Sequence, residues 1–154
     1  MSNFWGSLHY RQIYYHIVFR THNGEKVLDQ ENIRNLFAYI MGIIQKRNCY
    51  LYRINAMEDH VHILCDLHPS VTLADLVRDV KASSSMWIKE QPSFPKFKGW
   101  AEGYGAFTCS YAEKDRVAAY IKGQQEHHRK FSFEEEYRRL LQEHGVEVDE
   151  RYFP

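Results

Sequence analysis

Apolar residues recur at helical spacing in two stretches of the chain. One stretch starts after Asp29, a suitable N-cap, and the other after Thr72, which with Asp75 resembles a capping box. Residues three and four apart share one face of a helix, so both stretches predict amphipathic helices. Their apolar positions are Ile33, Leu36, Phe37, Ile40 and Ile44 in the first, and Leu73, Leu76, Val77, Val80, Trp87 and Ile88 in the second.

Four β-rich segments alternate with these helices, at residues 9–20, 48–57, 60–67 and 104–111. The resulting order through residue 111 is β-α-β-β-α-β, the ferredoxin-like arrangement of the α+β class. That arrangement predicts an antiparallel sheet whose first and third strands lie in the middle, with both helices on one face.

Two more helices are predicted after the last strand. One runs from residue 113 to about residue 128, and a shorter one covers residues 131–144. The second opens with clustered acids, as the helix dipole favours, and Gly145 would end it. We expect residues 1–154 to form one domain, in which these two helices cover the second face of the sheet.

Charge and composition bound the classes of function only loosely. The formal net charge is zero, but residues 131–154 hold seven acids and three Lys or Arg, so this acidic tail carries −4 and the rest +4. Cys49, Cys65 and Cys109 are widely spaced and odd in number, as expected for free thiols in a reducing compartment. No apolar run is long enough to span a membrane. We therefore expect a cytoplasmic protein with no membrane partner.

Two histidines lie one residue apart in the third predicted strand, within the sequence AMEDHVHILCDL. Side chains alternate across a strand, so His60 and His62 point to the same face, at a separation of about 7 Å. Val61, Ile63 and Cys65 then point toward the helices. Two neutral imidazoles on one face can share a divalent cation, although a pair at this spacing also occurs by chance in strands.

The helix around residues 113–128 offers a third ligand and a nucleophile. Tyr120 and Gln124 are four residues apart and so lie on one helical face. An amide oxygen suits a hard cation such as Mg²⁺ or Mn²⁺. A phenol has a reference pKa of about 10, and beside a cation and a polarised phosphate it becomes a usable nucleophile that forms a phosphotyrosine. On its own, Tyr120 would be an ordinary half-buried residue of an amphipathic helix.

These motifs, taken in order, resemble the single-tyrosine HUH endonucleases. This family comprises bacterial insertion-sequence transposases, including the REP-associated tyrosine transposases. YYHIVFRTHNG resembles the first strand of the family and MEDHVHIL its two-histidine signature. LVRDVKASSS resembles the middle helix, and AAYIKGQQEHHRKFSFEEE the helix of the catalytic tyrosine and the tail.

The resemblance implies a fold, a reaction and partners. The fold would be the ferredoxin-like sheet, with His60, His62 and Gln124 as ligands of Mg²⁺ or Mn²⁺ and Tyr120 as nucleophile. The reaction would be transposition, by cleavage of single-stranded DNA with hairpin ends through a 5′-phosphotyrosine. The free 3′-hydroxyl would later attack that link and rejoin the strands. The protein would be a homodimer, in which the tyrosine helix of one subunit can complete the site of the other.

Further residues are candidates for supporting roles. His16 lies on the neighbouring central strand, and Asp59 precedes the first histidine, so both are candidate second-shell groups. Basic and hydroxyl side chains on the middle helix and first strand are candidates for phosphate contacts, which position DNA without reading its sequence. These candidates are Arg20, Arg78, Lys81, Ser84 and Ser85.

Two other functions remain open on the sequence alone. A non-catalytic nucleic-acid-binding module of the same fold would stack bases on sheet aromatics such as Tyr14, Tyr50 and Tyr52. A metal-dependent phosphoesterase would use activated water and leave Tyr120 structural. Binding alone does not require the set of His60, His62, Tyr120 and Gln124, and a denaturation-resistant protein–DNA adduct separates the transposase from the phosphoesterase.

Overall fold

The computed structural model describes residues 10–153 of the chain. Its elements follow the predicted alternation, with short 3₁₀ turns between some of them. In chain order they are β1 (Tyr14–Arg20), η1 (His22–Gly24), α1 (Ile33–Lys46), β2 (Leu51–Ala56), β3 (His60–Asp66), α2 (Leu73–Lys89), β4 (Gly105–Cys109), η2 (Tyr111–Glu113), α3 (Lys114–Lys122), α4 (Gln124–His127) and α5 (Phe133–Glu143).

The four strands form one sheet in the order β2-β3-β1-β4. Every neighbouring pair is antiparallel, and β1 and β3 occupy the middle. In the register of the central pair, His16 lies opposite Leu64 and Arg20 opposite His60. The predicted ferredoxin-like α+β fold is confirmed.

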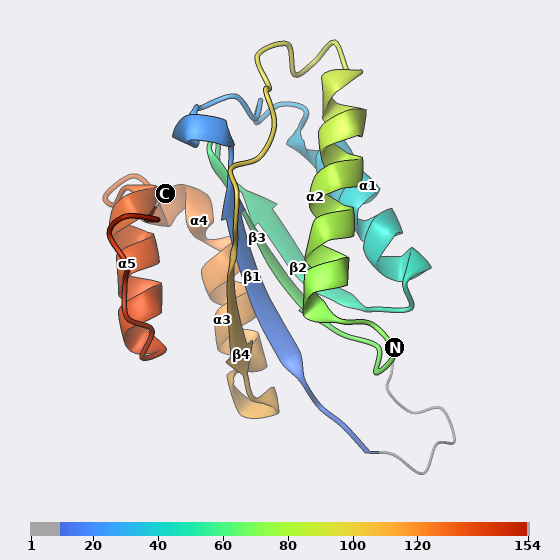
Figure 1. Ribbon diagram of the computed structural model, residues 1–154, viewed down its shortest axis with the longest axis vertical. Coiled ribbons are helices and arrows are strands. Elements are labelled where there is room, and N and C mark those ends of the chain that lie inside the picture. Colours follow the sequence, from blue (N-terminus) through green and yellow to red (C-terminus); the bar gives the residue numbers. More distant parts are fainter. Residues whose placement is uncertain (1–9, 154) are drawn as a thin grey trace.

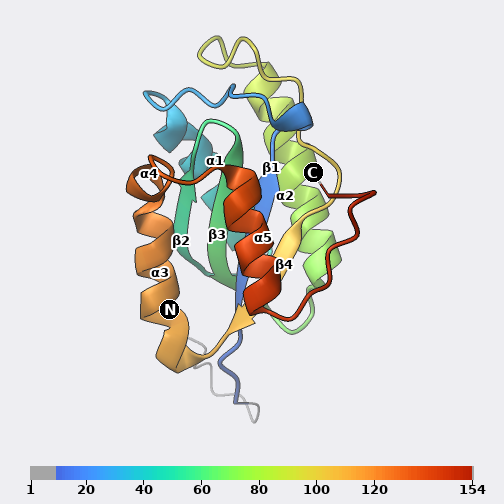
Figure 2. The ribbon, with the colours of Figure 1, turned by 90° about the vertical axis from the view of Figure 1, so that its left-hand side faces the viewer.

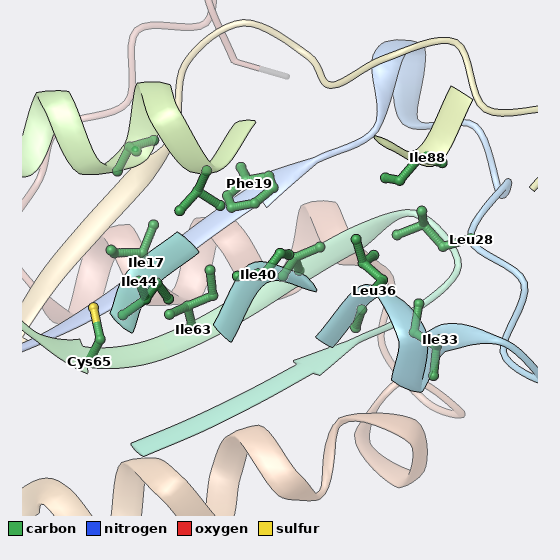
Figure 3. Close-up of a cluster of buried hydrophobic side chains, with 14 of the residues drawn as sticks. Ile17, Phe19, Leu28, Ile33, Leu36, Ile40, Ile44, Ile63, Cys65 and Ile88 are labelled. Carbon is green, nitrogen blue, oxygen red and sulfur yellow. The ribbon is translucent and has the colours of Figure 1, made fainter. Parts of the chain in front are cut away.

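Helices α1 and α2 cover one face of the sheet and enclose the main core (Figure 1). Val61, Ile63 and Cys65 of β3 point into it, as the alternation along the strand predicts. Figure 3 shows Ile40 and Ile44 of α1 gathered with Ile17 and Ile63 of the sheet in this core. Full burial of each such side chain contributes roughly 1.5–3 kcal/mol, which fixes which face of β3 is inside.

The opposite face of the sheet is covered by α3 and α5, as Figures 1 and 2 show. Two smaller apolar clusters attach these helices to the sheet. Val18 and Phe107 pack with α5, and Tyr14 and Leu64 pack with Ile121 of α3. The prediction that the final helices cover this face is confirmed, and the two histidines of β3 point toward them.

Several predicted boundaries differ from the observed ones. The first strand begins at Tyr14 rather than residue 9, which lies outside the described residues. Asp29 is not the N-cap of α1, because Asn32 holds that position. Asp29 instead orders the preceding turn by accepting hydrogen bonds from Glu31 N and the side-chain nitrogen of Asn32. Thr72 does cap α2, since its hydroxyl accepts from Asp75 N at 3.1 Å.

The predicted continuous helix over residues 113–128 is broken at Gly123, which separates α3 from α4. Asn55 of β2 explains how the break is tolerated. Its side-chain nitrogen donates to the carbonyl oxygens of Ile121 at 2.8 Å and Lys122 at 3.3 Å. These are end-of-helix carbonyls that otherwise lack an intrahelical donor. The break lets the chain change direction directly before Gln124.

The cysteines and the helices can be compared with the expectations of free thiols and of no membrane-spanning segment. The three cysteines are free, and Cys49 and Cys65 are buried. Burial raises the pKa of the Cys65 thiol, so this residue behaves as a small apolar group. Within residues 10–153, none of the helices is both long enough and apolar enough to cross a bilayer.

Candidate active site

Strand β3 delivers His60 and His62 to the face covered by α3 and α5. Both side chains are fully buried, at 0% exposure, and their ring centroids lie 5.1 Å apart. The expectation that they share a face is confirmed. Two polar rings with no access to solvent need partners on every nitrogen, because an unpaired buried polar group is costly.

The outer nitrogen of each ring is held by a neighbouring side chain. His60 Nδ1 donates to Asp59 Oδ1 at 2.6 Å. His62 Nδ1 lies 2.8 Å from His16 Nε2. His16 and Asp59, the two supporting candidates from the sequence, therefore contact the histidines, and such contacts set the ring orientation and leave Nε2 facing inward.

Helices α3 and α4 bring Tyr120 and Gln124 to the same place. Gln124 is fully buried, and its Oε1 lies 3.3 Å from His60 Nε2. The Tyr120 ring centroid is 5.9 Å from that of His62. The four residues singled out from sequence thus meet within one chain.

A fifth residue, Glu136 of α5, lies at the centre of this group. Its Oε2 accepts hydrogen bonds from the Tyr120 hydroxyl and from Gln124 Nε2, the latter at 2.8 Å. Its Oε1 lies 3.0 Å from His128 Nε2, 3.2 Å from His62 Nε2 and 3.4 Å from His60 Nε2. The carboxylate is only 2% exposed.

Glu136 was not among the site residues predicted from the sequence, where its segment indicated only acids that the helix dipole favours. The spacing of apolar residues in α5 nevertheless pointed to it. Phe133, Glu136, Tyr137 and Leu140 follow the spacing of one helical face, and all four are buried. A carboxylate on an apolar face needs a partner, so this position already indicated a buried ionic or metal contact.

The electrostatics of the site follow from burial and from this carboxylate. Burial opposes ionisation of Glu136, yet hydrogen bonds from His128, His60 and His62 outweigh it and lower its pKa far below the usual range. Burial also lowers the pKa of His62. For His60, hydrogen bonds to Asp59 and Glu136 outweigh burial and raise the pKa.

The nucleophile candidate is held in its protonated form. Burial, followed by the charge of Glu136 and the hydrogen bond to it, raises the pKa of Tyr120. A phenol in this state becomes nucleophilic when a general base or a nearby cation stabilises its ionised form. The site thus places Tyr120 beside a carboxylate and a group of atoms that could hold a cation.

The donor set fits a metal ion. One ligand atom from each of His60, His62, His128 and Glu136 lies within 4.8 Å of the others. His60 and His128 donate their Nδ1 hydrogens outward, to Asp59 and to the Phe131 carbonyl oxygen at 2.7 Å. Loss of the Nε2 hydrogens that these rings donate to Glu136 would leave neutral rings with lone pairs directed at the carboxylate, and a cation could then take the place of those hydrogens.

A cavity of about 510 Å³ opens beside Tyr120, between α3, β4 and α5. Its lining includes the cationic side chains of Arg116 and Arg139 and the carboxylates of Glu113, Glu136 and Glu143. Arg116 pairs with Glu113 at 3.0 Å. The cavity is therefore of mixed charge, and Arg116 and Arg139 are the lining groups that could contact a phosphate.

The other candidates for DNA contact lie elsewhere. Ser84 is buried in the main core, where its hydroxyl accepts from Trp100 Nε1 at 3.0 Å, so the predicted phosphate contact of Ser84 is wrong. Lys81 donates to the carbonyl oxygens of Ala101 and Gly103. Arg78 pairs with Asp75 on the exposed side of α2.

Only one of these candidates belongs to the histidine face. The guanidinium of Arg20 on β1 lies 4.8 Å from the ring centroid of Phe133, and the residue pairs with His60 in the strand register. Contact of Arg20, Arg78, Lys81 or Ser85 with DNA stays a prediction.

The aromatic residues proposed for base stacking do not form a solvent-exposed surface on the sheet. Tyr14 is 2% exposed and packs beneath α3 with Ile121. The Tyr14 ring makes an edge contact with the ring of Tyr52. Of the three tyrosines, Tyr50 alone is an exposed residue, at 45%. A sheet covered by helices lacks the exposed surface that a base-stacking module uses.

Comparison with known proteins identifies the family of the chain. Residues 9–124 match the family described as IS200-like transposases. The transposase for insertion sequence element IS200 from Salmonella typhimurium, and that from Salmonella typhi, are each 26% identical over 117 residues, which is 73% of this chain and 76% of theirs.

Two solved structures share the fold. A candidate transposase from Deinococcus radiodurans R1 is 24% identical with a TM-score of 0.57, over 80% of this chain and 98% of that chain. A REP-associated tyrosine transposase bound to a REP hairpin is 12% identical with a TM-score of 0.59, over 83% and 74%. Since the family match spans most of the chain, the chain belongs to the IS200-like transposase family.

Proposed function

We propose that this transposase cleaves and rejoins single-stranded DNA through a 5′-phosphotyrosine formed on Tyr120. The observation that carries the proposal is the convergence of half-buried Tyr120 with Gln124 and the two β3 histidines, which are fully buried. Binding alone would not require a tyrosine hydroxyl beside a buried set of metal-ligand atoms.

The residues proposed to hold the cation are His60, His62 and Gln124. A divalent ion such as Mg²⁺ or Mn²⁺ bound there supplies Lewis-acid polarisation of the scissile phosphate. Asp59 and His16 orient the two imidazoles through their outer nitrogens. Gln124 Nε2 donates to Glu136, which turns the amide oxygen toward His60.

The proposed chemistry is an exchange of one phosphodiester for another. The Tyr120 oxygen attacks phosphorus and loses its proton, while the bond from phosphorus to the 3′-oxygen breaks and that oxygen takes up a proton. The fragment downstream of the break stays on the tyrosine through its 5′-phosphate, and the upstream fragment leaves with a 3′-hydroxyl. Attack by a 3′-hydroxyl reverses these steps and joins strands, so no nucleotide cofactor is consumed.

The proposed substrate is single-stranded DNA with hairpin ends. Arg116 and Arg139, beside the cavity at Tyr120, would receive the phosphates. The whole chain would act as one cytoplasmic unit, in a homodimer. Because Tyr120 meets the histidines of its own chain, each subunit of such a dimer would carry a full set of site residues.

A labelled-oligonucleotide experiment tests the proposal. Hairpin oligonucleotides labelled at the 5′ or 3′ end are incubated with Mn²⁺ and wild type, Tyr120→Phe or His62→Ala, then run on denaturing gels. The wild type should give a covalent adduct that carries the 3′ label, because the tyrosine is bonded to the 5′-phosphate of the downstream fragment. Both variants and EDTA should remove it, because the first lacks the nucleophile and the others lack the bound ion.

Two results would contradict the proposal. Cleavage without an adduct, unchanged in Tyr120→Phe, would make water the nucleophile and the protein a phosphoesterase. An adduct that survives in Tyr120→Phe would place the nucleophile on another residue. Tyr111, an exposed tyrosine in η2, is the matched control, and Tyr111→Phe should behave as wild type.

A further inference from the structure

We infer that α5 belongs to the catalytic centre, with Glu136 and His128 completing the metal ligand set and Glu136 also holding Tyr120 in place. The inference rests on the proposed function, since it assigns two further residues to the same site. The predicted ligand set consisted of His60, His62 and Gln124.

One oxygen of the carboxylate faces the metal ligands. Glu136 Oε1 lies within 3.0–3.4 Å of the Nε2 atoms of three histidines, which arrive from β3 and from the end of α4. An anionic oxygen surrounded by three imidazole nitrogens is a typical first shell for a transition-metal ion. With three nitrogen ligands, the set favours Mn²⁺ over Mg²⁺.

His128 is oriented for the same task. Its Nδ1 hydrogen donates to the Phe131 carbonyl oxygen at 2.7 Å, which leaves Nε2 directed at Glu136. Its ring centroid lies 4.6 Å from that of His60. A ring whose outer nitrogen is fixed by a carbonyl is the arrangement that metal-binding histidines commonly show.

The other oxygen faces the nucleophile. Glu136 Oε2 accepts hydrogen bonds from the Tyr120 hydroxyl and from Gln124 Nε2. One carboxylate therefore joins the nucleophile, the amide ligand and the histidine nitrogens. Loss of this group should disturb the position of Tyr120 as well as the ion, and holding reactants in place contributes strongly to rate.

The helix that carries Glu136 is anchored independently of the site. Ser132 and Glu135 form a capping box at its start, and Phe133, Tyr137 and Leu140 pack against Val18 and Phe107 of the sheet. The family match ends at Gln124, so α5 lies beyond it. The carboxylate is therefore supplied by a helix outside the residues that the family match covers.

A rival explanation makes Glu136 a block that occupies the place of the scissile phosphate. The two explanations predict opposite effects of a Glu136 substitution on the rate of adduct formation. If Glu136 is a ligand and positioning group, its neutralisation weakens Mn²⁺ binding and slows adduct formation. If it is a block, neutralisation leaves Mn²⁺ affinity intact and accelerates the reaction.

The first measurement is Mn²⁺ affinity without DNA, by calorimetric titration and by the electron paramagnetic resonance signal of free Mn²⁺. Glu136→Gln and His128→Asn should each bind Mn²⁺ at least about 10-fold more weakly than wild type. Asn at position 128 can keep a donor toward the Phe131 carbonyl oxygen and loses only the Nε2 ligand. Glu134→Gln removes the same charge from the exposed side of α5 and should change the affinity by less than about 2-fold.

The second measurement is the rate of adduct formation at saturating Mn²⁺ and DNA. Glu136→Gln should be slower than wild type even when the ion is saturating, and Glu136→Asp should recover part of the rate. Circular dichroism spectra confirm folding, and if Glu136→Gln unfolds, His128→Asn carries the affinity test.

Unchanged or tighter Mn²⁺ binding in both variants, or a faster reaction in Glu136→Gln, would overturn the inference. Failure of the proposed function looks different, because the wild type itself would then form no adduct. A Glu136→Gln effect on Mn²⁺ affinity is measured without DNA and does not depend on that outcome.

Discussion

The direction of each imidazole decides what the site can bind. His60, His62 and His128 each have one ring nitrogen engaged by a neighbour outside the cluster, namely Asp59, His16 and the Phe131 carbonyl. Each presents Nε2 to the same carboxylate oxygen. Removing an outer partner should therefore affect metal binding without removing a ligand.

Asp59→Asn tests this expectation. The carboxylate accepts the His60 Nδ1 hydrogen at 2.6 Å, and an amide in its place is a weaker acceptor that can also turn its nitrogen toward the ring. We expect Mn²⁺ affinity to fall by about 10- to 100-fold, measured by calorimetric titration. Glu58→Gln, an exposed neighbour with the same charge change, should bind as wild type, and an equal loss in both variants would refute the role of Asp59.

At the scale of elements, the junction between α3 and α4 sets the relative positions of Tyr120 and Gln124. Asn55 of β2 and Gln125 of α4 form a reciprocal amide pair, with hydrogen bonds of 2.8 and 2.9 Å. The Asn55 side-chain nitrogen also donates a hydrogen bond to the Ile121 carbonyl oxygen near the end of α3. One buried side chain on an edge strand thus joins the two helices that carry Tyr120 and Gln124.

Asn55→Ala should cost stability as well as alignment. It leaves the carbonyl of Ile121 without its donor in a buried environment, and such a loss costs about 1–3 kcal/mol. Urea denaturation followed by circular dichroism measures the change in the free energy of unfolding. Asn35→Ala, at an exposed position of α1, should stay within about 0.5 kcal/mol of wild type, and equal effects at both sites would contradict the prediction.

At the scale of the whole molecule, the two faces of the sheet have separate tasks. One face holds the large apolar core under α1 and α2, and the other holds the polar cluster under α3 and α5. The acidic tail of net charge −4 includes α5, which packs on the face that carries the site. Metal binding should therefore stabilise α5 against the sheet and, with it, the folded chain.

Mn²⁺ should raise the unfolding temperature. A ligand at about 100 times its dissociation constant adds about 2.7 kcal/mol to the free energy of unfolding. For a chain of this size that corresponds to a shift of roughly 5–10 °C. Differential scanning calorimetry with Mn²⁺ and then with EDTA measures it, and His62→Ala should lose the shift. An equal shift in His62→Ala would place the ion elsewhere.

Local patterns in the sequence were sufficient for much of the fold. Apolar spacing identified α1 and α2, and alternation along 60–66 placed His60 and His62 on one face because a strand allows no other arrangement. The order of elements indicated the sheet, since few topologies satisfy it. The same logic brought Tyr120 and Gln124 onto one side of their segment.

The tertiary structure decided the features that depend on contacts between distant segments. His62 and Glu136 are 74 residues apart in the chain, and no local pattern encodes their meeting. Ser84 is removed from solvent by Trp100, and the break at Gly123 is stabilised by Asn55 of another element. Local periodicity determines which face of an element is apolar. Which polar groups then share the buried space is decided by how the elements pack, because each buried charge must find its partner there.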